Sequence, residues 1–121
     1  MADELRVRLR DALRAAMKER NKPAVAAFRT ALGVIDNAEA ADVSQAPAAE
    51  AGHIAGGRAG LGAGEVPREH RTDDELVALL GAELARWAAT AADYERAGRA
   101  TEAADLRSEI TALDAVLNGR G

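Results

Sequence analysis

The chain has 121 residues and a formal net charge of −4, and it contains no cysteine. The length fits one ordinary domain, and the lack of cysteine excludes disulfide bonds, thiolate catalysis and Cys-based metal sites. Hydrophobic residues make up 48% of the chain but aromatic residues only 2%, so a core must be built from Leu, Ile, Val and Ala. Because β-branched runs typical of strands are missing, the composition predicts an all-α fold.

The first segment, from Asp3 to about Arg20, has an apolar residue at every fourth position. These residues are Leu5, Leu9, Leu13 and Met17. This spacing is typical of an amphipathic helix. A second helix is expected from about Pro23 to Ala41, since proline is favoured in the first turn of a helix and a helical apolar period follows it. Residues 1–42 are therefore predicted to form an antiparallel helical hairpin.

Residues 43–71 are rich in Ala and Gly, with six glycines between Gly52 and Gly64. We expect a flexible linker there, with mobility around Gly56 to Gly64 and room for a short helical turn from Ala46 to Ala51. The glycine spacing matches neither a phosphate-binding loop nor a dinucleotide-binding fingerprint. His53 and His70 fall in the same segment, so they are interpreted as solvated loop residues and not as metal ligands.

A long helical hairpin is predicted for residues 72–118. Thr72 and Glu75 form a capping-box pattern, after which apolar residues recur at helical spacing for about 25 residues, as far as Gly98. Thr101 is the expected N-cap of the last helix, which should end at Asn118 and Gly119. The fold prediction is thus about four helices arranged as two antiparallel hairpins, joined by a Gly/Ala-rich linker in one domain.

Charge is unevenly distributed between the two predicted hairpins. Residues 1–29 carry eight basic and four acidic groups, whereas residues 72–118 carry four basic and ten acidic groups. Five cations of the first hairpin are candidate nucleic-acid contacts, namely Arg6, Arg10, Arg14, Lys18 and Arg29. The alternative is that they are a solvated charged flank of the helix, in which Asp11 pairs with Arg14. The chain offers few aromatic platforms on which bases could stack.

The last helix carries a heptad-like apolar row that is a candidate interface. Its members are Leu106, Ile110, Leu113 and Leu117. Because one hairpin cannot bury both of its apolar stripes alone, this row is expected to pack on the first hairpin or on a second copy of the chain. Association into a homo-oligomer is therefore one of the predicted outcomes.

Nothing in the sequence resembles a catalytic constellation, and no cofactor or metal site is predicted. The longest apolar run, Leu76 to Ala82, is too short to span a bilayer, and the N-terminus lacks the apolar segment of a secretory signal. The expected location is the cytoplasm, without a membrane partner.

Two blocks of the sequence resemble the GatB/YqeY family. The first is LRDALRAAMKERNKPAVAAFRTALGVIDNAE, in which the resemblance depends on Met17, Lys18, Arg29, Leu32, Ile35, Asn37 and Glu39. The second is ELVALLGAELARWAATAADYERAGRATEAADLRSEITALDAVL, in which it depends on Tyr94, Ala97, Gly98, Arg99, Ala104, Glu109 and Leu113. Together the blocks cover most of the chain outside residues 43–71.

The resemblance implies a helical domain related to the C-terminal region of the GatB subunit of the tRNA-dependent amidotransferase. In that family the helical domain is normally followed by a small tail domain associated with tRNA contact, and this sequence is expected to lack that domain. A non-enzymatic binding module associated with tRNA or with amidotransferase subunits is the leading functional expectation. The alternatives are a structural or oligomeric protein-interaction module and, from the family name alone, a part of a carbon–nitrogen ligase that uses glutamine as amido donor.

Overall fold

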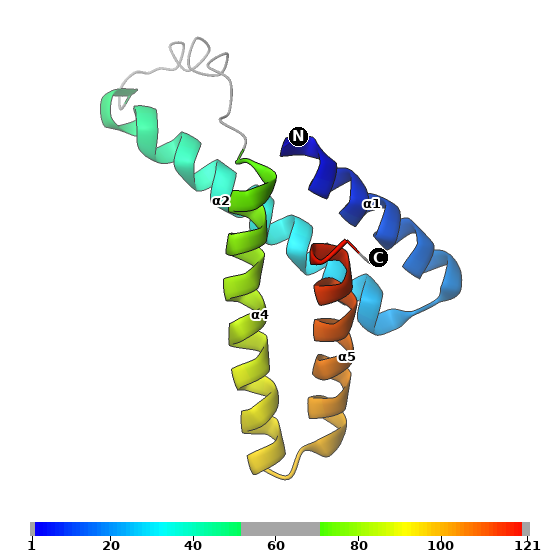
Figure 1. Cartoon of the computed structure of the whole chain (residues 1–121). Coiled ribbons are helices and arrows are strands. Elements are labelled where there is room, and N and C mark those ends of the chain that lie inside the picture. The colour runs from blue at the N-terminus through cyan, green and yellow to red at the C-terminus, as the bar shows by residue number, and fades with distance from the viewer. Residues whose placement is uncertain (1, 52–70, 120–121) are drawn as a thin grey trace.

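The computed structural model describes residues 2–51 and 71–119, which form four helices. They are α1 (Ala2–Glu19), α2 (Lys22–Ala51), α4 (Asp73–Arg96) and α5 (Ala100–Leu117). In the described part of the chain every regular element is helical, which confirms the all-α prediction. Figure 1 shows two helical hairpins, α1–α2 and α4–α5, with α4 and α5 running across α2.

The turn between α1 and α2 is tight and well defined. Arg20 adopts a left-handed conformation with φ 59°, and the Asn21 amide donates to the Ala16 carbonyl at 2.9 Å. This pattern closes the C-terminus of α1 in the way that a glycine usually does. The Asn21 side chain then accepts a hydrogen bond from the Ala24 amide at 3.2 Å, so the same residue caps the start of α2.

The second helix is longer than the sequence predicts. It was expected to end near Ala41, but α2 continues to Ala51 and so includes the first part of the predicted 43–71 linker. The alanine-rich composition of this stretch favours helix, and α2 continues through Pro47 to its end. Residues 52–70 lie outside the described residues. The mobility prediction for Gly56 to Gly64 and the interpretation of His53 and His70 concern this segment, so the structure does not test them.

The second hairpin starts as predicted and ends almost where predicted. Thr72 and Glu75 form a complete capping box, and α4 ends before Gly98, which has φ 78°. The predicted N-cap of α5 is wrong: the helix begins at Ala100 with Arg99 as N-cap and no side-chain capping bond. Thr101 instead lies inside the first turn of α5, because the glycine turn returns the chain to helix two residues earlier than expected.

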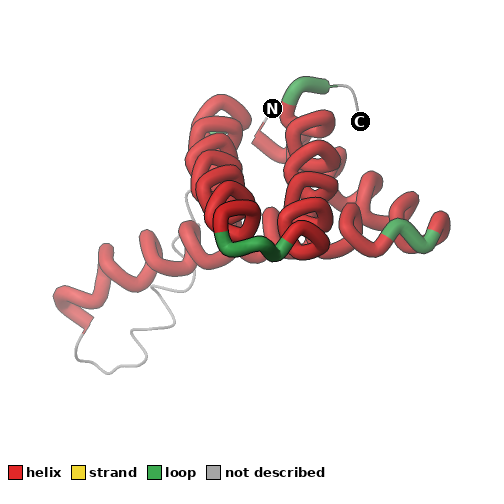
Figure 2. Tube along the Cα trace, turned by 90° about the horizontal axis from the view of Figure 1, so that it is seen from below, coloured by secondary structure: helices red, strands yellow, loops and turns green. Residues whose placement is uncertain are grey.

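All four helices contribute to one buried core. Its largest fully buried apolar side chains are Leu5, Leu9, Ile35, Leu76, Leu80, Leu113 and Val116. Helix α5 packs extensively on both α4 and α2, while α1 packs mainly on α2. In Figure 2, which views the molecule from the tip of the α4–α5 hairpin, α2 crosses behind both helices of that hairpin. The half of α4–α5 near the tip extends beyond the first hairpin (Figure 1).

Candidate functional surface on the first hairpin

Arg6 is not part of an exposed basic surface. Its guanidinium pairs with the Glu39 carboxylate, and the two residues are 6% and 1% exposed. Glu39 also accepts a hydrogen bond from the Arg71 backbone amide at 3.1 Å, so this carboxylate connects α1, α2 and the residues that lead into α4. Arg6, the first of the five candidate nucleic-acid contacts, is therefore buried in the helix interface, where it cannot reach the phosphates of a partner.

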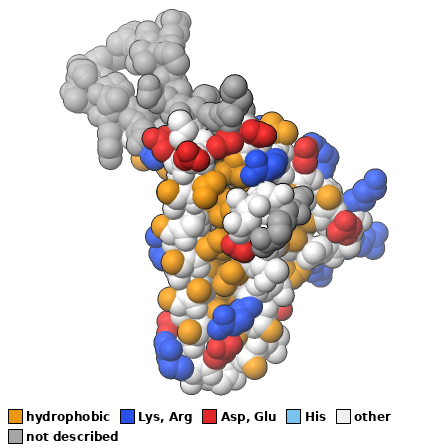
Figure 3. Space-filling view, in the orientation of Figure 1, with side chains coloured by type: hydrophobic (Ala, Val, Ile, Leu, Met, Phe, Trp, Pro, Cys, Tyr) orange, Lys and Arg blue, Asp and Glu red, His pale blue; other side chains and the backbone are white. Residues whose placement is uncertain are grey.

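The other four candidate cations are exposed but are not equivalent. Arg14 donates to Asp11 at 2.7 Å within α1, as expected. Arg10, Lys18 and Arg29 are exposed, and none of them forms an ion pair within the described part of the chain. Figure 3 shows Lys and Arg side chains gathered where the first hairpin turns, opposite the end from which α2 projects. Lys18, Arg20 and Lys22 belong to this region and are all exposed.

The ion pairs of Arg6 show which residues of α1 and α2 lie opposite each other beside the buried core. Besides Glu39, the Arg6 guanidinium lies 3.7 Å from the Asp36 carboxylate. On an α-helix, residues 4, 7 and 11 positions apart share one side. Positions 6, 10, 13 and 17 therefore form one row along α1, and positions 36, 32, 29 and 25 form the antiparallel row along α2.

These two rows form a mixed apolar and basic surface, which we call the outer strip. It consists of Arg10, Leu13 and Met17 from α1 and Val25, Arg29 and Leu32 from α2. Leu13, Val25 and Leu32 are partly buried against the core, whereas Met17 is 49% exposed. The outer strip is thus an apolar centre flanked by two exposed cations.

The predicted interface row on α5 is mostly used within the molecule. Leu113 is completely buried in the core shared with the first hairpin. Leu106, Ile110 and Leu117 are intermediate in exposure. Since Leu113 is inaccessible, the four residues do not form a continuous exposed row.

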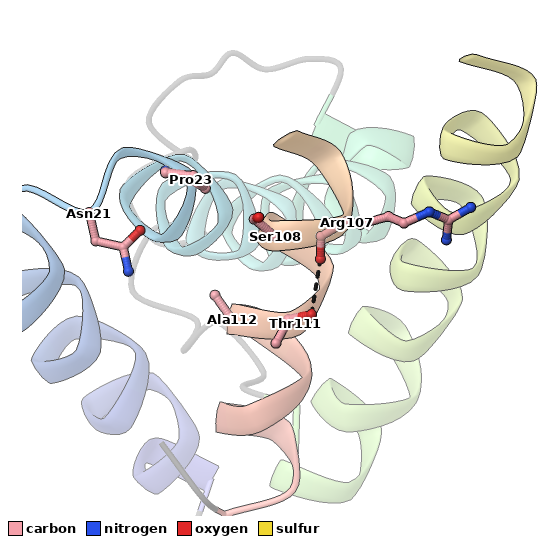
Figure 4. A pocket seen from close by; sticks show the side chains of 6 residues that line it. All are labelled: Asn21, Pro23, Arg107, Ser108, Thr111 and Ala112. Atoms are coloured by element: carbon pink, nitrogen blue, oxygen red, sulfur yellow. Dashed lines mark hydrogen bonds between the residues drawn. The ribbon is translucent and has the colours of Figure 1, made fainter. Parts of the chain in front are cut away.

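One shallow hollow of about 450 Å³ lies between the α1–α2 turn and α5. It is lined by Asn21, Pro23, Arg107, Ser108, Thr111 and Ala112. As Figure 4 shows, Arg107 points away from the hollow toward α4. There its guanidinium donates to Glu95 at 2.9 and 3.0 Å.

The remaining polar groups of the hollow do not form a catalytic arrangement. The Thr111 hydroxyl donates to the Arg107 carbonyl at 3.0 Å (Figure 4), and the Asn21 side-chain oxygen is occupied in capping α2. The lining contains neither an imidazole nor a carboxylate that could activate the Ser108 hydroxyl. The hollow therefore lacks a nucleophile–base pair.

The described residues contain neither a metal site nor a membrane-spanning helix. No group of three or more histidine, aspartate or glutamate side chains there is arranged to hold a metal ion. None of the helices in residues 2–51 and 71–119 combines the length and apolar character needed to cross a bilayer.

Comparisons of the chain with protein-family models, with curated proteins and with solved structures give no match. The resemblance to the GatB/YqeY family therefore remains a prediction from the residues of the two blocks. Several residues of the two blocks have defined structural roles. Ile35 and Leu113 are buried in the core, Glu39 forms an ion pair with Arg6, and Gly98 lies in the turn between α4 and α5.

Proposed function

We propose that this chain is a non-enzymatic helical binding module of the GatB/YqeY type, which acts with the tRNA-dependent amidotransferase by binding one of its protein subunits. The binding surface is the outer strip of the first hairpin. The observation that supports a protein partner is the exposure of the apolar Met17 on the same strip as two exposed arginines, Arg10 and Arg29. Methionine adapts its shape to a partner surface, and arginine is enriched in protein interfaces.

A second candidate partner is tRNA. It is supported by the exposed cations Lys18, Arg20 and Lys22 near the α1–α2 turn, which continue the basic flank begun by Arg10. Phosphate contacts of this kind require only positive charge and give salt-dependent binding. We favour the protein because Arg6 is withdrawn from the surface, Arg14 is shared with Asp11, and apolar side chains occupy the centre of the outer strip.

The test is a binding titration of the purified full chain against purified tRNA-dependent amidotransferase and, separately, against tRNA, each at low and moderate salt. The proposal predicts micromolar or tighter binding to the amidotransferase that persists at moderate salt and weakens in an Arg10→Ala, Arg29→Ala variant. Binding to tRNA alone, with strong salt dependence, would support the second candidate instead. Absence of binding to either at micromolar protein would overturn both.

A further inference from the structure

The chemistry of the outer strip specifies what kind of protein segment it binds. We propose that its occupant is an amphipathic helix of a partner protein with an apolar stripe bordered by acidic residues, which packs along α1 and α2 as a third helix. This inference rests on the proposed function and adds the partner's chemistry to it.

The shape of the surface favours a helix. Two antiparallel helices with apolar rows along one side leave a surface into which the side-chain ridge of a third helix can pack. Leu13, Val25 and Leu32 are already half-buried against the core, so they are held in place before a partner arrives. Such prior ordering reduces the entropy that binding would otherwise cost.

The charges of the outer strip determine which side chains are favoured on the flanks of the partner helix. Arg10 borders the apolar centre on the α1 side and Arg29 borders it on the α2 side. Each is exposed and lacks an ion-pair partner within the described residues, so both are available to carboxylates on the two sides of an incoming helix. A helix with basic flanks would meet like charges instead, which disfavours binding.

The remaining surface of the first hairpin does not offer the same combination. Val7 is 49% exposed on α1, but it belongs to neither of the two rows that form the outer strip. The carboxylate of Asp36, 67% exposed, marks the end of the strip nearest Arg6. An acidic helix is therefore expected to occupy the part of the strip from Arg10 to Met17.

The experiment uses the full chain and a fluorescein-labelled synthetic peptide of about 18 residues, long enough for five helical turns. The peptide carries Leu at helical spacing with Glu on both flanks. One control peptide has the same composition with its Leu positions scrambled, and another has Lys in place of Glu. Fluorescence anisotropy measures the affinity of each peptide for the wild-type chain.

Matched variants identify the surface. Met17→Ser removes the exposed apolar side chain of the strip, and Val77→Ser removes a comparably exposed side chain on α4, 38% exposed. Arg10→Glu with Arg29→Glu reverses the flanking charges, and Arg96→Glu reverses a charge near the tip of the α4–α5 hairpin. Circular dichroism confirms that each variant keeps its helix content.

The proposal predicts that the acidic peptide binds about tenfold more tightly than either control peptide, and that the double charge reversal weakens it about tenfold or more. Met17→Ser weakens it several-fold, while Val77→Ser and Arg96→Glu leave it within about twofold. Equal binding of the scrambled peptide, or dependence on the arginines without dependence on Met17, would overturn the helix assignment. If the amidotransferase binds while the strip variants change nothing, the proposed function survives and this inference fails.

Discussion

The guanidinium of Arg6 and the carboxylate of Glu39 form an ion pair inside the α1–α2 interface, with 6% and 1% of the two residues exposed. Glu39 also receives the Arg71 amide, and Asp73 accepts a hydrogen bond from the Leu5 amide at 3.4 Å. The beginnings of α1 and α4 are thus joined to α2 by polar contacts at one end of the core. These contacts fix the two hairpins relative to each other and leave the outer strip free.

Removing one partner of this buried pair should be costly. Arg6→Met removes the Arg6 guanidinium from the buried Glu39 carboxylate, and we expect the free energy of unfolding to fall by about 3 kcal/mol or more. The double variant Arg6→Met, Glu39→Leu should lose less stability than Arg6→Met alone, because the buried Glu39 carboxylate is then removed together with Arg6. Urea unfolding of the three proteins provides the measurement. A loss below about 1 kcal/mol in Arg6→Met would show that the pair does not hold the interface.

The left-handed backbone at Arg20 makes a second prediction. A residue with a side chain is disfavoured at φ 59° by roughly 1 kcal/mol, whereas glycine is not. Arg20→Gly should therefore be more stable than Arg20→Ala by about 1 kcal/mol, although both variants lose the same charge. Thermal unfolding of the pair tests this directly. A less stable glycine variant would mean that this turn is not left-handed in solution.

The capping box at the start of α4 should contribute measurably to stability. The Thr72 hydroxyl accepts from the Glu75 amide at 3.1 Å, and the Glu75 carboxylate accepts from the Thr72 amide at 2.9 Å. Thr72→Ala should lower the free energy of unfolding by about 1 kcal/mol, and Thr72→Ser should restore most of it. Denaturant titration distinguishes the two variants, and equal stabilities would argue against the capping role of the hydroxyl.

Glu109 on α5 should destabilise the fold at neutral pH. Burial raises the pKa of its carboxyl, and the nearby Asp105 carboxylate raises it further. A carboxyl whose pKa is raised in the folded state binds a proton more tightly there than in the unfolded state. Its ionised form therefore lowers the free energy of unfolding at pH values above the folded pKa, and this loss disappears below the unfolded pKa. Glu109→Gln should therefore be more stable than the wild-type chain at pH 7.

The pH dependence of this effect provides its control. The advantage of Glu109→Gln should diminish as the pH falls through the raised pKa, and little should remain near pH 4, below the ordinary value of 4.5. The measurement is urea unfolding of both proteins at several pH values. If the stability advantage of Glu109→Gln stays constant between pH 7 and pH 4, the negative charge of Glu109 is not the cause of that advantage.

The sequence predicted the helices well because each one has its own local signals. Apolar residues every three or four positions identify α1, α4 and α5, and Thr72, Gly98 and Asn118 mark three of the helix ends. The end of α2 was missed because an alanine-rich stretch has helix propensity without an apolar period. Local signals of this kind say little about where such a helix stops.

The candidate surface could be predicted only in part. Arg6 belongs to the same row of α1 as Arg10, so spacing alone could not separate the buried arginine from the exposed one. The difference depends on Glu39, which is 33 positions away and meets Arg6 only after the hairpin closes. The signal that could have indicated the buried pair is the acidic residue Glu39 on the apolar side of α2. For the row that contains Leu113, the sequence left open packing on the first hairpin or on a second copy, and the structure places Leu113 in the core shared with the first hairpin.

The most direct test of a binding role for the outer strip is an NMR titration of the chain labelled at its methionine methyl groups, with unlabelled tRNA-dependent amidotransferase as the added partner. Assignment by Met17→Leu identifies the Met17 methyl signal. We expect this signal to shift or broaden in proportion to the amount of complex formed. Formation of the complex with the Met17 signal unchanged would contradict it.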